Sequence, residues 1–244
     1  MSGAEAAYEA QARGELDRWR ARMTREPGPL AKATREMQDS INRLIPEKVH
    51  AAVTAAVEQV TRAILTGADV TTWAVLEDAP LSEREARVRS RIKAYRTVAA
   101  AEGGVAGAGG FLLAAADFPA LIAIKIKLLF EIAALYGRSG RDFGERLYIL
   151  SIFQLAFSSA RHRRQILEGV VDWDARRADL PSSPDAVDWR RFQQEYRDYI
   201  DLAKLAQLVP VIGAPVGAVV NWRLLDQLGE TAINAYRLRW FAER

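Results

Sequence analysis

Hydrophobic side chains recur at helical spacing along most of the chain. Between residues 8 and 23 the apolar positions are three or four residues apart, with charged residues between them, as in an amphipathic helix. The same spacing predicts helices over residues 30–44 and 46–66, the latter with a proline in its first turn. No stretch alternates apolar and polar residues in the manner of a strand. The pattern therefore predicts an all-α fold.

A fourth helix is expected to begin at Ser82. Ser82 and Glu85 have the spacing of a capping box, in which the serine side chain caps the helix and the glutamate reaches back to its first backbone N–H. The apolar stripe then runs to Val98, which we expect to be buried. Residues 84–96 are also strongly basic, with Glu85 as their one acid.

Two segments depart from the amphipathic pattern because they are hydrophobic and rich in glycine and alanine. The first covers residues 103–124 and runs into a helix over 120–136, whereas the second covers residues 205–220 and precedes a helix over 221–241. Small residues allow helices to approach closely, so we expect two hydrophobic hairpin segments packed centrally in a single multi-helix domain. The residues that should shape them are Gly103, Gly107, Gly110, Pro119, Gly137, Pro210, Gly213 and Gly217.

The length of 244 residues suits one large domain. We expect residues 1–45 to form N-terminal amphipathic helices that make one structural unit with a helical domain over residues 46–244. Between the two glycine-rich segments, Asp142 should cap a helix, and a polar loop over residues 169–188 should precede a further helix.

Composition and charge remove several classes of function. The chain has no cysteine and two histidines, so thiol chemistry is excluded, and we expect neither a metal site nor a cofactor. The 34 basic residues are mostly interleaved with the 31 acidic ones, and no aromatic stacking platform lies among them, so nucleic acid is not an expected partner. Charged residues interrupt the first apolar positions, so there is no continuous hydrophobic region of the kind that a signal peptide needs. We therefore expect no signal peptide and a cytoplasmic protein.

The two glycine-rich segments raise the question of a membrane. A transmembrane helix needs about 20 predominantly apolar residues, whereas residues 103–122 contain Asp117 and residues 205–220 contain two prolines. Two interpretations stay open. The segments are either hairpins buried in a helical bundle or hairpins that touch a membrane surface or a membrane partner.

The candidate site residues lie in or beside these segments. Asp117 is either a carboxylic acid with a raised pKa or the N-cap of the next helix. Lys125 is a candidate contact for a phosphate headgroup, while Lys127 and Glu131 have the spacing of a surface ion pair. Asn221 is expected at the start of the last helix. The full candidate ligand-binding or lipid-binding set is Asp117, Lys125, Tyr136, Asn221 and Arg223.

A basic cluster forms a second candidate site. Arg161, Arg163 and Arg164 are expected near the end of a helix, where they suit the helix dipole. They would also attract an anionic membrane leaflet, by about 1 kcal/mol each. No G-x-S-x-G, H-E-x-x-H or P-loop motif is present, so no catalytic residue is assigned.

Several ordered motifs resemble the EcsC family. Ala-Asp-Phe-Pro-Ala at 116–120, leading into Ile-Ala-Ala-Leu-Tyr-Gly at 132–137, is similar to the core signature of that family. So are the segment at 209–221 and Tyr-Arg-Leu-Arg at 236–239. The resemblance covers about residues 80–243.

The resemblance implies an α-helical, membrane-associated accessory protein, because the family is named for a component encoded beside an ABC-type transporter. It supplies no catalytic residue. One departure is that residues 138–141 separate the Tyr-Gly pair from Asp142, where the family tends to continue with an aromatic residue and an aspartate.

We therefore expect a cytoplasmic protein, peripheral to the membrane, that acts through lipid or a membrane-protein partner. One alternative is a soluble protein that binds a hydrophobic small molecule or an acyl chain between the hairpins. The other alternative is a hydrolase that uses Asp117 and Glu102.

Overall fold

The computed structural model describes six stretches of the chain, and helices dominate all of them. These stretches are residues 2–25, 47–67, 73–108, 118–158, 162–187 and 214–244. Within them the elements are α1 (Gly3–Thr24), α3 (Glu47–Thr66), α4 (Leu81–Ala108), α6 (Phe118–Leu135), α7 (Phe143–Phe157), α8 (Arg163–Val171), two short 3-10 turns (Arg177–Asp179 and Pro184–Ala186) and α11 (Ala214–Ala242). None of these elements is a β-strand, and the predicted all-α class is confirmed.

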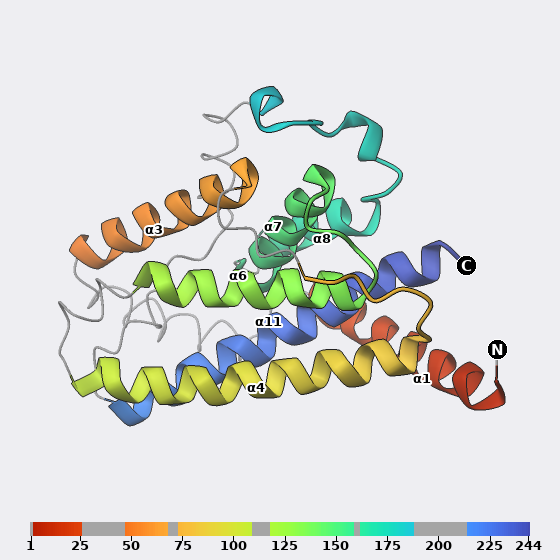
Figure 1. The fold of residues 1–244 in the computed structure, drawn as a ribbon, viewed down its shortest axis with the longest axis horizontal. Helices are drawn as coiled ribbons and strands as arrows, with labels where there is room; N and C mark the ends of the chain where they lie inside the picture. Colours follow the sequence, from red (N-terminus) through yellow and green to blue (C-terminus); the bar gives the residue numbers. More distant parts are fainter. Residues whose placement is uncertain (1, 26–46, 68–72, 109–117, 159–161, 188–213) are drawn as a thin grey trace.

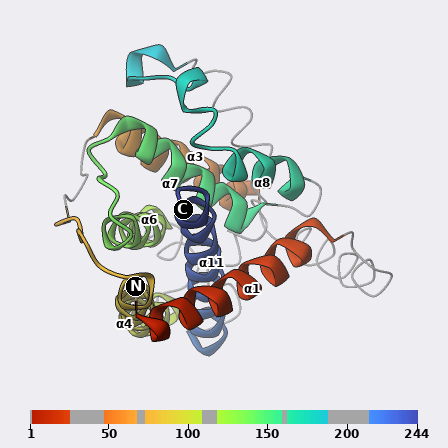
Figure 2. The same ribbon diagram turned by 90° about the vertical axis from the view of Figure 1, so that its right-hand side faces the viewer.

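Helix α11 lies at the centre of the bundle. It contacts α1, α4, α6, α7 and α8, and the view along the molecule shows it between them (Figure 2). Every residue from 231 to 239 is buried. A helix that is buried on all sides must be surrounded by other elements, so the C-terminal half of α11 is the axis on which the rest is assembled.

The long helices α4, α6 and α11 run along the length of the molecule (Figure 1). Two ion pairs join α4 to α11. Glu85 pairs with Arg237 and Arg96 pairs with Asp226, so α4 and α11 are antiparallel. They pack closely at Gly229, where an added Cβ would lie 2.6 Å from Cδ1 of Ile92.

Turn residues set the C-terminal end of α6 and the start of α7. Gly137 has φ +85°, and the N–H of Arg138 donates to the carbonyl oxygen of Ala133 at 2.9 Å, which is the αL turn that closes many helices. Asp142 caps α7 as predicted, because its side chain accepts a hydrogen bond from the backbone N–H of Gly144 at 3.1 Å.

The capping box predicted at the start of α4 is wrong. Both the backbone N–H and the hydroxyl of Ser82 donate to the carboxylate of Glu5 in α1. The carboxylate of Glu85 is turned into the bundle, where Arg237 is a stronger partner than a backbone N–H. The burial of Val98 is also wrong, because its side chain is 51% exposed.

Much of both glycine-rich segments lies outside the described residues, as do the helices predicted over 30–44 and after residue 188. The structure places Gly103 and Gly107 in α4, Pro119 in the first turn of α6 and Gly217 in α11. Gly110, Pro210 and Gly213 are among the residues that the structure does not describe.

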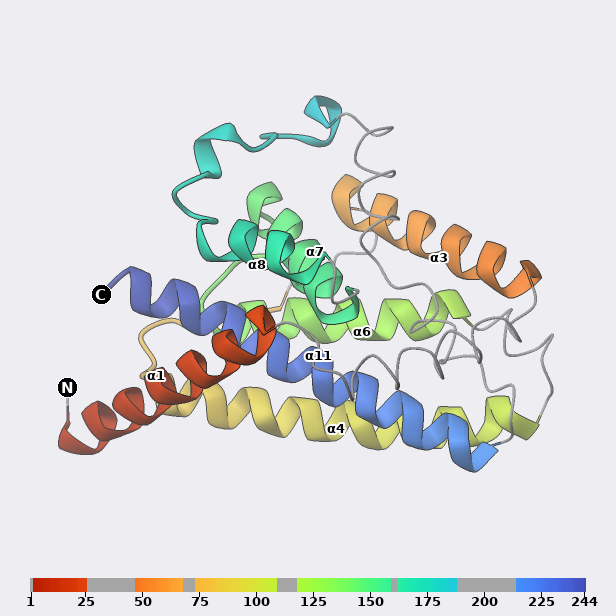
Figure 3. The same cartoon turned by 180° about the vertical axis from the view of Figure 1, so that it is seen from behind.

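The helix ends that border these segments lie together. The last turn of α4 and the first turns of α6 and α11 are at the same end of the molecule, as the views from opposite sides show (Figures 1 and 3). Both glycine-rich segments are therefore attached to the bundle at this end, which we call the segment end.

Candidate functional site

A buried ionic cluster holds α11 in the bundle. The carboxylate of Glu85, which is fully buried, accepts hydrogen bonds from Nε and Nη2 of Arg237 at 2.6 and 2.7 Å. The hydroxyls of Tyr8 and Tyr136 donate to the same carboxylate at 2.8 and 3.2 Å. Bidentate pairs of this kind are strong and directional, so the cluster fixes α1, α4 and α6 against α11.

A second buried carboxylate repeats this arrangement on α7. Glu145 accepts hydrogen bonds from the hydroxyl of Tyr236 at 2.6 Å and from Nη1 of Arg239 at 2.7 Å. Arg239 also donates two hydrogen bonds of 2.8 Å to Asp174, in the loop after α8. This side of α11 is thereby tied to α7 and to the loop.

Tyrosine rings pack between the two carboxylates. The rings of Tyr136 and Tyr236 stack with their centroids 5.0 Å apart. Burial raises the pKa of both phenols well above the usual range, and the charges of Glu85 and Glu145 raise it further. The phenols therefore stay protonated and act as donors. Because these charges and hydroxyls are all paired with one another, the cluster is suited to holding the fold rather than to chemistry on a substrate.

Two of the sequence-predicted residues meet elsewhere in the core. Lys125 of α6 is 1% exposed, and its Nζ donates to Oδ1 of Asn221 at 2.7 Å. Asn221 lies within α11 and not at its start, because the helix already begins at Ala214. Proline is tolerated in a first helical turn, so Pro215 does not delay the helix. The ammonium group of Lys125 is thus covered by protein rather than presented on the surface.

The rest of the candidate ligand-binding set is dispersed. Tyr136 belongs to the Glu85 cluster, Arg223 is exposed on α11, and Asp117 lies outside the described residues. The surface ion pair predicted between Lys127 and Glu131 is wrong. Glu131 is buried and pairs with Nε of Arg91 at 2.7 Å, whereas Nζ of Lys127 lies 5.8 Å from the ring centroid of Trp73.

The basic cluster also differs from the prediction. Arg163 and Arg164 lie in the first turn of α8, at its N-terminal end, and not near the C-terminal end of a helix. Arg161 is not among the described residues. Nη2 of Arg164 donates to the carbonyl oxygen of Thr24 at 3.1 Å. Because Thr24 is the last residue of α1, Arg164 satisfies a free carbonyl at the end of a neighbouring helix.

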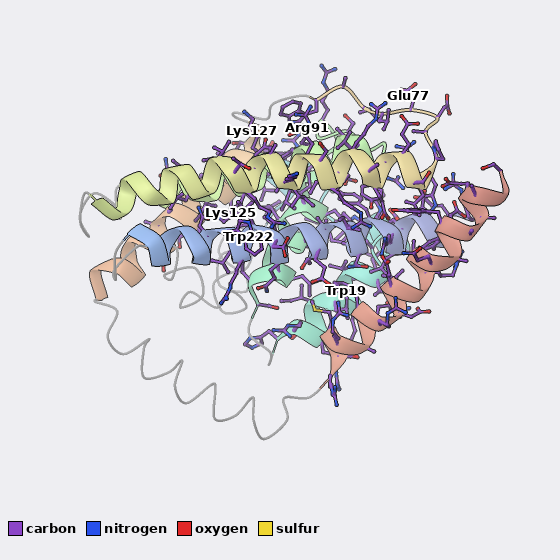
Figure 4. The ribbon with its side chains drawn as sticks, turned by 90° about the horizontal axis from the view of Figure 1, so that it is seen from below. Trp19, Glu77, Arg91, Lys125, Lys127 and Trp222 are labelled. Carbon is purple, nitrogen blue, oxygen red and sulfur yellow. The ribbon has the colours of Figure 1, made fainter. Side chains whose placement is uncertain are left out.

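An exposed tryptophan marks the surface that the sequence did not reveal. Trp222 is 39% exposed on α11 (Figure 4), and with Val98 it is one of two large hydrophobic residues that are exposed among the side chains whose burial the structure describes. The guanidinium of Arg96 lies 3.8 Å from the centroid of the Trp222 ring and also pairs with Asp226 at 2.8 Å. Tryptophan is enriched at surfaces where one side of the ring meets an apolar environment and the other meets water.

Trp222 lies in the wall of a surface groove of about 1080 Å³, which we call the α1–α4–α11 groove. Helices α1 and α4 are held together at one end by the contacts of Glu5 with Ser82 and of Tyr8 with Glu85, and they then separate with α11 between them (Figures 3 and 4). The lining residues are Glu15, Arg18, Arg22, Arg89, Ile92, Lys93, Arg96, Thr97, Trp222, Asp226, Glu230, Ile233, Asn234 and Arg237.

The groove carries an excess of positive charge. Its three acids are each paired with an arginine, in the pairs Glu15–Arg237, Asp226–Arg96 and Glu230–Arg22. Arg89 pairs with the buried Glu85. Arg18 and Lys93 also line the groove, and neither forms an ion pair with another described residue. The groove can therefore accept an anion without breaking an existing pair.

Other classes of site find no support in the residues that the structure covers. These contain no group of three or more histidine, aspartate and glutamate side chains placed to hold a metal ion. Within the same residues, no helix combines the length and apolar character that crossing a membrane requires.

The fold and these sites define an all-helical bundle protein with a buried ionic centre and a cationic surface groove. The model of the EcsC protein family matches residues 10–241, so the chain belongs to the EcsC family and the resemblance is confirmed. The Tyr-Gly and Tyr-Arg-Leu-Arg motifs that carried it meet in the buried cluster of Tyr136, Tyr236 and Arg237.

Two relatives from Bacillus subtilis (strain 168) are similar to this chain. Protein EcsC is 40% identical over 226 residues, which cover 92% of this chain and 93% of that protein. The uncharacterized protein YdbA is 32% identical over 172 residues, covering 69% of this chain and 63% of that protein. No solved structure matches the chain significantly.

Proposed function

We propose that the protein is a cytoplasmic, membrane-peripheral accessory factor that places the segment end and the adjoining Trp222 surface against an anionic membrane. The observation that carries the proposal is the exposed Trp222, which lies under Arg96 in the wall of a groove with surplus positive charge. Tryptophan favours the boundary between headgroups and acyl chains, and each basic residue near an anionic surface adds about 1 kcal/mol of attraction.

The position of the hydrophobic segments supports the same orientation. Val98 and Trp222 lie on the two helices, α4 and α11, that lead to the segment end. A bilayer that lies along α4 and α11 from this end as far as Val98 and Trp222 would cover both exposed side chains and would also meet the glycine-rich segments. Shallow contact of this kind requires no membrane-spanning helix. The proposed partner is lipid, and a membrane protein such as an ABC-type transporter is the other outcome that the test distinguishes.

Vesicle co-sedimentation tests the proposal. At low salt the protein should bind vesicles that contain phosphatidylglycerol and not vesicles of phosphatidylcholine alone, and binding should fall as salt screens the surface charge. The double variant Trp222→Ala/Val98→Ser should bind about tenfold more weakly, because it loses the apolar contact.

The matched control is Phe241→Ala at the opposite end of α11, where the guanidinium of Arg13 lies 4.1 Å from the centroid of the Phe241 ring. This variant also removes an aromatic ring stacked with an arginine, yet it should leave vesicle binding unchanged. The proposal fails if the wild-type protein ignores anionic vesicles, or if both variants weaken binding equally. Binding to native membranes alone, and not to lipid vesicles, would point to a membrane protein as the partner.

A further inference from the structure

The register of α1 against α11 places Arg18 opposite Asn234. Glu15 pairs with Arg237 and Arg22 pairs with Glu230, so the two helices run in opposite directions across the groove. Arg18 lies between Glu15 and Arg22 on one face of α1, as Asn234 lies between Glu230 and Arg237 on one face of α11.

Asn234 carries an acceptor that has no partner in the described residues. Its side chain is 4% exposed and lines the groove, and its Nδ2 donates to the carbonyl oxygen of Glu230 at 2.9 Å. Its Oδ1 accepts no hydrogen bond. A buried acceptor without a donor destabilises the fold, and such a group in a native structure calls for an explanation.

The chemistry of the groove specifies two features of a ligand. Arg18 and Lys93 offer uncommitted positive charges from opposite walls, which favours an anion such as phosphate. The Oδ1 of Asn234 requires a donor. In a groove with surplus positive charge, a neutral hydroxyl suits that position better than an ammonium group does. Ile92 and Ile233 add an apolar surface beside these polar groups.

We infer that the α1–α4–α11 groove binds a phosphate ester that carries a free hydroxyl. Arg18 and Lys93 hold the phosphate, and Asn234 accepts a hydrogen bond from the hydroxyl. This inference rests on the proposed function, because it names the headgroup chemistry that the groove beside Trp222 recognises. The ester has two possible sources, a polyol-phosphate headgroup such as that of phosphatidylglycerol and a free polyol phosphate.

Calorimetric titration with glycerol phosphate and with methyl phosphate tests the site without a membrane. The wild-type protein should bind glycerol phosphate several-fold more tightly than methyl phosphate, which has no hydroxyl. Arg18→Ala/Lys93→Ala should bind both esters about tenfold or more weakly, since it removes two charged donors. The control Arg20→Ala/Arg87→Ala removes the same charge from α1 and α4 outside the groove, and it should bind like the wild type.

The variant Asn234→Leu separates recognition from folding. It removes an unsatisfied acceptor at nearly constant volume, so its melting temperature should equal or exceed that of the wild type. It should nevertheless lose the preference for glycerol phosphate over methyl phosphate. A retained preference, or equal weakening by the groove and control double variants, would overturn the inference.

Vesicles of phosphatidylglycerol and of phosphatidylmethanol, which has the same charge but no headgroup hydroxyl, identify the source. If the wild type prefers phosphatidylglycerol and Asn234→Leu does not, the ligand is a lipid headgroup. If glycerol phosphate binds in the groove but no vesicle binds, the inference stands for a soluble ester and the proposed function fails. If vesicles bind through Trp222 but neither ester binds in solution and the lipid preference is absent, the proposed function stands and the inference fails.

Discussion

At the scale of single residues, the fold depends on charges that lie inside it. Glu85 and Arg237 are both buried, and so are Glu145 and Arg239. Bringing an ion out of water costs several kcal/mol unless a partner with good geometry compensates it. Apolar packing, such as that of Ile92 against Gly229, also favours one register of α11, and these pairs add hydrogen bonds that are satisfied only in that register. The buried pairs therefore specify the position of α11.

Replacing Glu85 tests this view of the buried pairs. Glu85→Gln leaves the guanidinium of Arg237 in the core without its main counter-ion, so the free energy of unfolding should fall by about 3–5 kcal/mol. Urea denaturation measures the change. The control is Glu83→Gln, which breaks an exposed pair with Arg87 and should change stability by less than about 0.5 kcal/mol. Similar effects of the two substitutions would contradict a structural role for the buried pair.

The sequence could not reveal these pairs because helical periodicity assigns charged residues to the surface. Glu85 has the spacing of a capping residue, and only the fold brings Arg237, 152 positions away, to its carboxylate. The available signal was Tyr-Arg-Leu-Arg within the predominantly apolar stretch 231–241, where Arg237 and Arg239 are two positions apart and so point to different sides of the helix. Asn234 gave no signal, because an unsatisfied acceptor is defined only by its surroundings.

At the scale of helices, the pair α4–α11 depends on one small residue. An added Cβ at Gly229 would lie 2.6, 3.0 and 3.2 Å from three side-chain atoms of Ile92. Gly229→Ala should therefore destabilise the protein by about 1–3 kcal/mol through overpacking, although alanine favours a helix over glycine by about 1 kcal/mol.

Two comparisons in thermal denaturation identify the cause. Gly14→Ala in α1, where the nearest atom to an added Cβ is Nη1 of Arg18 at 3.7 Å, should be neutral or stabilising. Ile92→Val combined with Gly229→Ala should be less destabilising than the sum of the single effects, because the shorter side chain relieves the contact. Destabilisation by Gly14→Ala, or strict additivity in the double variant, would rule out overpacking at the α4–α11 contact.

Helix positions and most helix starts were predictable, and the start of α11 was not. The helix expected over 120–136 is observed as Phe118–Leu135, and the one expected to begin at residue 221 starts at Ala214. Gly137 is an unambiguous turn residue at the C-terminal end of α6, and Asp142 is one at the start of α7. The start of α11 lies in an apolar run where a helix and an extended chain give similar patterns, so periodicity cannot locate it.

At the scale of the whole molecule, the two ends of the bundle differ in character. The ionic cluster of Glu85 and Glu145 holds one end together through α1, α4, α6, α7 and α11. Toward the segment end, α1 and α4 have separated, Val98 and Trp222 are exposed, and both glycine-rich segments are attached. This polarity is the basis for the proposal that one end faces the membrane and the other holds the fold.

Site-specific labelling measures that orientation most directly, because the chain has no native cysteine. A nitroxide on Val98→Cys leaves Trp222 in place and reports from the part of α4 that leads to the segment end. A nitroxide on Glu77→Cys reports from the opposite end, where Glu77 is exposed (Figure 4). On addition of phosphatidylglycerol vesicles, the label at position 98 should become accessible to oxygen and shielded from a water-soluble nickel complex, while the label at position 77 stays unchanged. If vesicles bind while the label at position 98 stays exposed to the nickel complex, or while the label at position 77 is shielded instead, the proposed orientation is wrong.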